Sequence, residues 1–259
     1  HRDGCRTPGG IGRIVLLLLP PSETKVQGGV PGRTGYPALS FPQLDSLRRE
    51  AADAVAHLSR TDPVAAARML KLGPKSVSEV EHNLALDSGI LLPALERYTG
   101  VLFAETGAAN WTDDQWLWAH EHVAVQSSLW GLIRAQDAIP AYRLSASSRL
   151  ADRSMTSRWS SAVTEVLAGV GSPWILDARS GGYRELGPVP ASVPSSYLEV
   201  VTKDGGAALN HFNKKHKGEL VRALVASMPD IASADDLISW GSLHGIDLSL
   251  RGDSVVLAV

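Results

Sequence analysis

The chain has 259 residues, of which 44% are hydrophobic and 20% are charged, and its formal net charge is −2. This is the composition of a globular protein with ample apolar material for a core, and the near-zero charge excludes a global basic field that would attract nucleic acid. The single cysteine, Cys5, excludes an internal disulfide and a thiolate cluster for zinc or iron–sulfur binding, which fits a reducing cytoplasm. Any nucleic-acid binding must therefore use a local basic patch.

Residues 1–13 are rich in turn-forming residues, and we expect them to be a disordered extension of a single domain over residues 14–259. Their glycines precede the first predicted strand, whereas a phosphate-cradling glycine turn follows a strand. The longest apolar run, residues 14–19, is far shorter than the roughly 20 residues that span a bilayer. Because no secretory signal pattern precedes this run, we expect a cytoplasmic protein without a membrane partner.

Residues 14–19 are apolar on both faces, which predicts a buried central strand that two prolines end. Ligand sites in open α/β sheets form at the carboxyl ends of the strands, so Ser22, Thr24 and Lys25 are expected at the mouth of a site. Ser22 and Lys25 also have the spacing of a nucleophile signature of serine acyl-transfer enzymes, although glycines and a proline follow where that signature opens a helix. A polar turn with a solvated lysine is the alternative.

The next segments are expected to be mainly helical. Apolar spacing predicts a helix over residues 44–58, a second helix to about residue 72, and a third helix over residues 77–86 after a Gly-Pro turn. Residues 98–106 are expected to form a short strand or turn whose polar side chains face the same site. The two helices around the Gly-Pro turn form either a phosphate-binding hairpin or an ordinary helical hairpin.

A further helix is expected to begin at Thr112, where two aspartates follow a good capping residue. Its apolar face is expected to carry Trp116 and Leu117. His120 and His122 would lie about 200° apart around the helix axis, so they cannot hold one metal ion together. We therefore expect no metal site on this helix.

Residues 125–150 combine apolar anchors with more hydrogen-bonding groups than a core segment needs. This mixture predicts the floor of a cleft. The alternative is that the first arginine pairs with a nearby acid and the others are ordinary surface charge. The polar side chains that we expect at the cleft are Gln126, Ser127, Ser128, Arg134, Asp137, Tyr142, Arg143 and Arg149.

A second buried strand is predicted over residues 173–178. Asp177, Ser180 and Tyr183 would emerge at its carboxyl end, beside the residues that follow the first strand. The two strand ends would then form one pocket. An aspartate that only caps a helix is the alternative for Asp177.

The densest basic run lies at residues 213–217 and precedes a predicted helix. Positive charge at a helix N-terminus is costly unless an anion neutralises it. Lys214, Lys215 and Lys217 therefore mark a candidate anion site, with a solvated charge run as the alternative. A last helix near residue 235 and a β-hairpin are expected to close the fold.

Five blocks in this order carry a resemblance to a known family: L-L-P-P-S-E-T-K at residues 18–25, Y-T-G-V-L-F-A-E-T at 98–106, G-L-I-R-x-x-D to S-R-L at 131–150, I-L-D-A-R-S-G-G-Y at 175–183, and N-K-K-H-K-G-E-L-V-R-A-L at 213–224. Together they resemble the YaaA peroxide-stress protein family. The resemblance implies an α+β (mixed α/β) fold: a single compact domain with a central mixed sheet, surrounding helices and a helix-hairpin-helix-like element.

The resemblance also implies a cytoplasmic protein of the hydrogen peroxide stress response that limits free-iron-dependent damage and binds double-stranded or distorted DNA non-specifically through a basic cleft. No cofactor is implied, and no carboxylate-rich or cysteine-rich motif supports direct iron binding. The alternative is an enzyme of unknown reaction that acts on a small anionic metabolite. The DNA-binding residues would be Lys71, Lys75, Arg134, Arg143, Arg149, Lys214, Lys215 and Lys217. The pocket residues would be Ser22, Thr24, Lys25, Ser127, Tyr142, Asp177, Ser180 and Tyr183.

Overall fold

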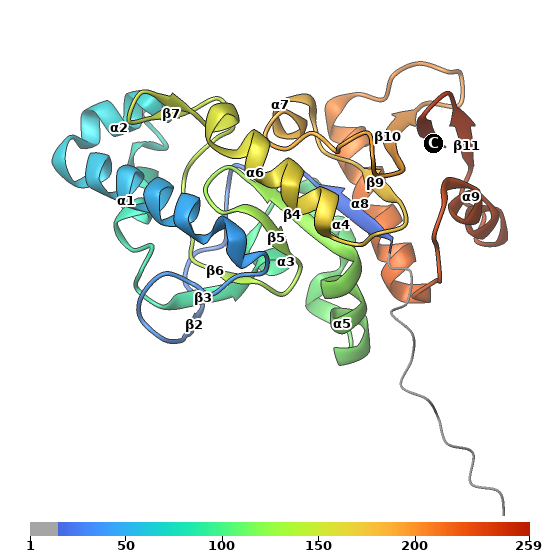
Figure 1. Cartoon of the computed structure of the whole chain (residues 1–259), viewed down its shortest axis with the longest axis horizontal. Coiled ribbons are helices and arrows are strands. Elements are labelled where there is room, and N and C mark those ends of the chain that lie inside the picture. The colour runs from blue at the N-terminus through green and yellow to red at the C-terminus, as the bar shows by residue number, and fades with distance from the viewer. Residues whose placement is uncertain (1–14) are drawn as a thin grey trace, which may run out of the picture.

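A central β-sheet organises residues 15–259, the part of the chain that the computed structural model describes. The predicted extension over residues 1–13 lies outside the described residues. The strands of the sheet are β1 (Leu16–Leu19), β4 (Val123–Ser127), β5 (Gly131–Arg134), β9 (Ile175–Asp177), β10 (Ser195–Val201), β11 (Leu248–Arg251) and β12 (Ser254–Ala258). Their order is β11-β12-β10-β9-β1-β4-β5 (Figure 1), with five parallel inner strands and an antiparallel strand at each edge. This mixed sheet confirms the predicted fold class.

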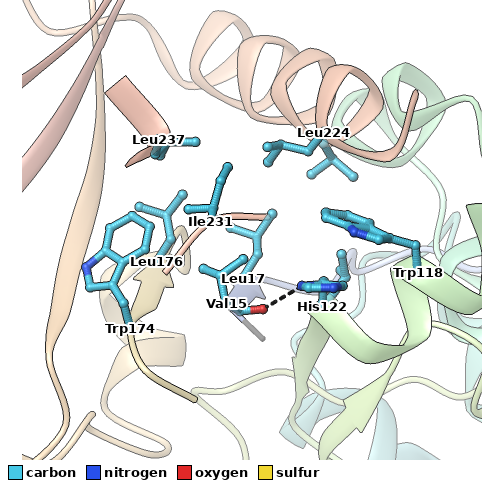
Figure 2. Close-up of a pocket in the computed structure, with 11 residues that line it drawn as sticks. Val15, Leu17, Trp118, His122, Trp174, Leu176, Leu224, Ile231 and Leu237 are labelled. Carbon is cyan, nitrogen blue, oxygen red and sulfur yellow. Dashed lines mark hydrogen bonds between the residues drawn. The ribbon is translucent and has the colours of Figure 1, made fainter. Parts of the chain in front are cut away.

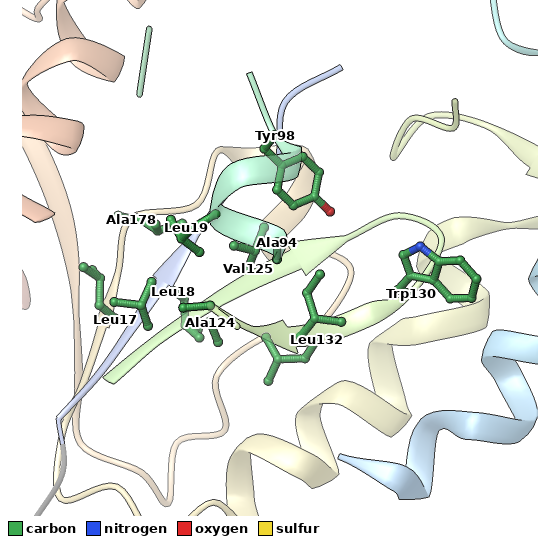
Figure 3. Packing of buried hydrophobic residues seen from close by; sticks show 14 of the residues in the cluster. Leu17, Leu18, Leu19, Ala94, Tyr98, Ala124, Val125, Trp130, Leu132 and Ala178 are labelled. Atoms are coloured by element: carbon green, nitrogen blue, oxygen red, sulfur yellow. The ribbon is translucent and has the colours of Figure 1, made fainter. Parts of the chain in front are cut away.

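The strand β1 lies inside the sheet because its residues are apolar on both faces. All four of its leucines are buried, and it pairs in parallel with β4 on one side and β9 on the other. Figure 3 shows Leu17, Leu18 and Leu19 packed beside Ala124 and Val125 of β4. The prediction of a buried central strand is confirmed, and the chain that follows β1 emerges in the middle of the carboxyl edge.

Helices cover both faces of the sheet. The α6 helix crosses one face in Figure 1, and its Trp159 indole donates a hydrogen bond to the Ser128 carbonyl at 2.8 Å. On the other face, Trp118 from α5 and Leu224 from α8 meet Leu17 of β1 around a small apolar pocket (Figure 2). The α-helices are α1 (Asp45–Thr61), α2 (Pro63–Met69), α3 (Ala94–Arg97), α4 (Val101–Thr106), α5 (Asp113–His122), α6 (Met155–Gly169), α7 (Gly181–Arg184), α8 (Asn210–Ser227) and α9 (Ala234–Leu243), and the 3-10 helices are η1 (Pro42–Leu44), η2 (Val77–Leu84) and η3 (Ala108–Asn110).

Two smaller sheets fix the long loops. One contains β2 (Val30–Pro31), β3 (Ile90–Pro93) and β6 (Ala138–Ile139), and the other pairs β7 (Arg149–Leu150) with β8 (Arg153–Ser154). Beside the first, the fully buried Arg97 donates hydrogen bonds to the carbonyls of Gly28 at 2.8 Å and Ile139 at 3.0 Å. A buried guanidinium that satisfies several carbonyls is a substitute for regular backbone pairing in this irregular region.

Most predicted helices are confirmed, with differences around the Gly-Pro turn. The helix α2 ends at Met69, two residues before Lys71 adopts a positive φ of 54°. The segment Val77–Leu84 is a 3-10 helix rather than an α-helix. Its Val77 and Leu84 side chains are exposed, so little apolar burial favours the regular α-helix. The helix-hairpin-helix-like element stays a prediction.

Three other expectations need correction. Residues 101–106 form the α4 helix instead of a strand or turn, because Gly100 supplies the positive φ of 92° from which the helix begins. The α5 helix has the expected start, a capping box at Thr112, but it buries His122 and exposes Leu117. The α8 helix begins at Asn210, so the basic run lies within its first turns and not before them.

Candidate functional site

A pocket of about 630 Å³ opens at the carboxyl ends of β1 and β9, and we call it the strand-end pocket. Its lining comes from the loop after β1, from the start of α4 and the residues just before it, from α7 and the residue before it, and from the start of α8. This is the edge of an open α/β sheet where ligands bind. Its polar lining residues are Ser22, Glu23, Thr24, Thr99, Ser180, Tyr183, Asn210, His211, Asn213, Lys214 and Lys217.

Hydrogen bonds to the segment before α4 hold the loop after β1 in place. The Ser22 hydroxyl accepts from the Thr99 amide at 2.9 Å and donates to the Thr24 carbonyl at 2.5 Å. The hydroxyls of Thr24 and Thr99 lie 2.6 Å apart. The Lys25 ammonium donates to the Glu23 carbonyl at 3.0 Å. Because the Ser22 hydroxyl donates to a backbone carbonyl, this arrangement does not activate it as the serine–lysine spacing had suggested.

Lys25 lies in a buried cluster beneath the loop. Its Nζ lies 3.9 Å from the centre of the Tyr142 ring, and the Tyr142 hydroxyl lies 2.8 Å from both the Tyr98 and Ser127 hydroxyls. Burial lowers the pKa of Lys25 to about 7, and Arg143 lowers it further while Glu23 opposes the shift. Three predicted pocket residues, Lys25, Ser127 and Tyr142, therefore come together, but none of them is among the residues that line the strand-end pocket.

Asp177 is held by two arginines. Its carboxylate accepts from the Arg179 side chain at 2.9 and 2.8 Å, and the Arg184 guanidinium lies 3.7 Å away. Arg179 is fully buried, so the pair is a desolvated, bidentate ion pair. Asp177 lines a separate pocket of about 430 Å³ beside Tyr197. It therefore acts as an anchor of the strand end and is not a free base in the strand-end pocket.

Lys217 reaches the strand-end pocket from α8. Its side chain is only 5% exposed, and its Nζ donates to the Ala178 carbonyl at 2.9 Å. Burial lowers the pKa of Lys217 to about 8, with Asp177 opposing the shift and Arg184 adding to it. Lys214 lines the same pocket but is exposed, whereas Lys215 pairs with Glu219 at 3.6 Å. The basic run thus divides into one buried pocket lysine, one exposed pocket lysine and one paired lysine.

Two of the predicted DNA-binding arginines make their contacts within the protein. Arg143 forms ion pairs with Glu79 at 3.1 Å and Glu23 at 3.6 Å. Arg134 donates to the carbonyls of His120 and Glu121 at the end of α5, at 3.0 and 2.7 Å. Such contacts satisfy the last carbonyls of the helix and favour its dipole. Both arginines therefore have evident structural roles.

A second cavity has a volume of about 450 Å³, and we call it the serine cavity because five of its eleven lining residues are serine or threonine. It shares Glu23 and Tyr183 with the strand-end pocket, so the two adjoin. Arg149 lines it, and the Lys71 ammonium lies 3.4 Å from the hydroxyl of Ser147 at its edge. Lys75 is exposed in the turn before η2.

Sequence reasoning missed two lining residues, Asn210 and His211, because it started the helix after them. It also missed Tyr98 as the buried hydroxyl partner of Tyr142. The signal available for the first pair was the turn at residues 205–206, which leaves only six residues before the basic run. Nothing local in the sequence indicates the tyrosine pair, since its members lie 44 positions apart.

Within residues 15–259, no group of three or more His, Cys, Asp and Glu side chains is placed to hold a metal ion. The same part of the chain contains no helix with the length and apolar character needed to cross a membrane. These findings concern only the described residues.

Comparison with known proteins gives matches over most of the chain. The family described as "Peroxide stress protein YaaA" matches residues 15–245. A UPF0246 protein of Corynebacterium efficiens is 37% identical over 253 residues, which cover 95% of this chain and 100% of that protein. A UPF0246 protein of Corynebacterium glutamicum is 36% identical and covers 90% of this chain and 94% of its own. One from Streptomyces coelicolor is 33% identical, with 82% and 84% covered.

Proposed function

The chain belongs to the family of the peroxide stress protein YaaA, which supports a role in oxidative stress, and we propose that it limits free-iron-dependent damage and binds double-stranded or distorted DNA without reading its sequence. The proposed contact surface is the groove formed by the strand-end pocket and the serine cavity. DNA phosphates would follow this groove, and basic side chains along it would neutralise them.

The observation that carries this proposal is a row of exposed cations along the two cavities. Lys214 lines the strand-end pocket, Arg149 lines the serine cavity, and Lys71 lies at the edge of the latter. Among the described residues, no side-chain carboxylate oxygen lies within 4.0 Å of these three cations, whereas Lys215 is paired with Glu219. Arg149 does donate a hydrogen bond to the main-chain carbonyl of Asp152, at 2.6 Å. Unpaired exposed cations are the groups that gain most from contact with phosphate.

The buried cations would support this surface and not touch the duplex directly. Arg143 fixes the loop after β1 through Glu23, and Arg134 closes the end of α5. Lys217 is buried in the lining of the strand-end pocket. We therefore assign the direct contacts to Lys71, Arg149 and Lys214, with Lys75 extending the row.

The test is duplex binding by a Lys214→Glu/Arg149→Glu variant, measured by fluorescence anisotropy with a labelled DNA of mixed sequence at low salt. We expect the affinity to fall by roughly tenfold or more, because two phosphate contacts become repulsive. A Lys203→Glu/Arg251→Glu variant has the same charge change at exposed positions outside both cavities and should bind nearly as wild type. Equal losses in the two variants would show that net charge, and not the groove, governs binding.

The proposed effect on iron would be indirect. The described residues contain no group of three or more His, Cys, Asp and Glu side chains placed to hold a metal ion. In peroxide-treated cells, loss of the protein should raise unincorporated iron, measured by electron paramagnetic resonance of chelated iron. If DNA binding underlies the protection from iron-dependent damage, the Lys214→Glu/Arg149→Glu variant should fail to lower the level of unincorporated iron. Wild-type iron levels in cells with this variant would show that the effect on iron does not depend on DNA binding.

A second candidate function is an enzyme that acts on a small anionic metabolite. It is favoured by the strand-end pocket, whose volume of about 630 Å³ lies in the range of small-molecule sites. Variants of the pocket residues Ser180 and Asn213, compared with charge reversal of Lys214 and Lys71, distinguish the two functions. Loss of DNA binding only in the lysine variants favours DNA, whereas intact DNA binding with both sets essential in cells favours an enzyme.

A further inference from the structure

Lys217 differs from the other lysines of the chain in its position. It is 5% exposed, yet it lines the strand-end pocket. Lys25 is also buried, but it lies against the Tyr142 ring and lines none of the cavities described above. Lys214 lines the same pocket in an exposed position. Lys217 is therefore the lysine that combines burial with a place in the lining of a small-molecule cavity.

The partners of Lys217 orient the amine without neutralising its charge. The one hydrogen bond that its Nζ makes to a described residue runs to the Ala178 carbonyl, at 2.9 Å. Asp177, the neighbouring carboxylate, is bonded to Arg179 and flanked by Arg184, and no described carboxylate oxygen lies within 4.0 Å of the Lys217 Nζ. An amine that is desolvated and lacks a counter-ion favours its neutral form, which is the nucleophilic form of lysine.

We propose that Lys217 is a nucleophilic amine that forms an imine with the aldehyde or ketone group of a small anionic compound held in the strand-end pocket. The nitrogen attacks the carbonyl carbon to give a carbinolamine. The carbonyl oxygen then leaves as water with the two amine hydrogens, and a carbon–nitrogen double bond remains. This activity goes beyond DNA binding and does not depend on it.

The pocket supplies a place for the negative group of such a compound. Lys214 lies one turn before Lys217 on α8, and Asn213 and His211 of the same helix also line the pocket. Ser180 and Thr24 also line the pocket and have hydroxyl groups. A carboxylate or phosphate near Lys214 would leave an attached carbonyl within reach of the next turn of the helix.

The lowered pKa of Lys217, about 8, fits this role. Near pH 8 about half of such an amine is neutral, against roughly one part in 300 for an ordinary lysine. Lysines that form Schiff bases are activated in the same way, by desolvation or by a neighbouring cation. Here both causes are present, since burial and Arg184 each lower the pKa.

The test is reductive trapping of the full-length protein with glyoxylate and cyanoborohydride near pH 8, followed by peptide mapping of every labelled lysine. We expect Lys217 to be labelled at least roughly tenfold faster than the exposed Lys71, Lys75 and Lys203. Inorganic phosphate should slow labelling at Lys217 alone, because it competes for the pocket. Labelling of Lys217 no faster than that of the exposed lysines, or only after denaturation, would overturn the proposal.

Two variants give the matched controls. Lys217→Arg keeps the charge and removes the amine, so the fast, phosphate-sensitive labelling should disappear while the exposed lysines react as before. Lys203→Arg changes an exposed amine outside both cavities and should leave the fast labelling of Lys217 as in the wild type. If glyoxylate labels Lys214 and Lys217 at equal rates in the wild-type protein, burial gives Lys217 no greater reactivity than an exposed lysine, and the proposal fails. Trapping and DNA binding use separate measurements, so failure of one is distinguishable from failure of the other.

Discussion

The buried Lys25 predicts that this protein becomes more stable as the pH rises above neutral. Its folded-state pKa is about 7, whereas the unfolded value is 10.5, so between these values the unfolded chain binds more protons than the folded protein. Stability therefore rises with pH through this range, is constant below about pH 7, and gains nothing more above the unfolded pKa. Each pH unit inside the range adds at most about 1.4 kcal/mol.

Between about pH 7 and pH 9 this linkage gives roughly 2 kcal/mol of added stability from Lys25. We limit the comparison to pH values below about 9 because burial raises the pKa values of Tyr98 and Tyr142. Once the tyrosines of the unfolded chain ionise near pH 10, the free energy of unfolding falls as the pH rises, which opposes the effect of Lys25. Lys217 adds a smaller rise of the same sign. The difference between wild type and a Lys25→Met variant isolates the contribution of Lys25.

The assay is urea unfolding followed by tryptophan fluorescence at several pH values within this window. The Lys25→Met variant should lose roughly 2 kcal/mol of the pH-dependent rise, because the thioether fills the site above Tyr142 without a buried charge. A Lys75→Met variant, at an exposed lysine, should keep the wild-type slope. If Lys25→Met also keeps it, the burial account of Lys25 is wrong.

Two structural predictions follow from the walls of the groove. Asp177→Asn removes the carboxylate that pairs with the fully buried Arg179, so urea titrations should show a free energy of unfolding lower by about 3–5 kcal/mol. A loss below about 1 kcal/mol would mean that water or another group neutralises Arg179 in place of the carboxylate. Gly218→Ala would place a methyl group 2.2 Å from the Leu102 carbonyl oxygen and push α8 away from α4. We therefore expect a lower melting temperature and weaker duplex binding. A wild-type melting temperature would show that the two helices can move apart without loss of stability.

The sequence predicts the sheet edge well because the relevant signals are local. The unbroken apolar run of β1 and its polar continuation place Ser22 and Thr24 at the carboxyl edge, and the same logic after β9 places Ser180 and Tyr183 there. These four side chains line one pocket. A strand that is buried on both faces needs no knowledge of its partners to be recognised.

The sequence does not predict which charged side chains are buried or paired within the protein, because the residues that they contact lie far away in the chain. Arg143 pairs with Glu23, 120 positions earlier, and Lys25 is buried by the ring of Tyr142. Short helices are missed for a related reason. The six residues of α4 are too few for a periodic signal, and the helix is stabilised by packing against α8 around Gly218.

The central claim is that cations distant in sequence form one phosphate-binding groove, and the salt dependence of duplex affinity tests it most directly. For the wild-type protein, the logarithm of affinity should fall linearly with the logarithm of salt concentration, by about 0.9 for each phosphate neutralised. The Lys214→Glu/Arg149→Glu variant should reduce this slope by about 2, one for each lost contact. An affinity that does not change with salt, or a slope that the double variant leaves unchanged, would contradict the claim.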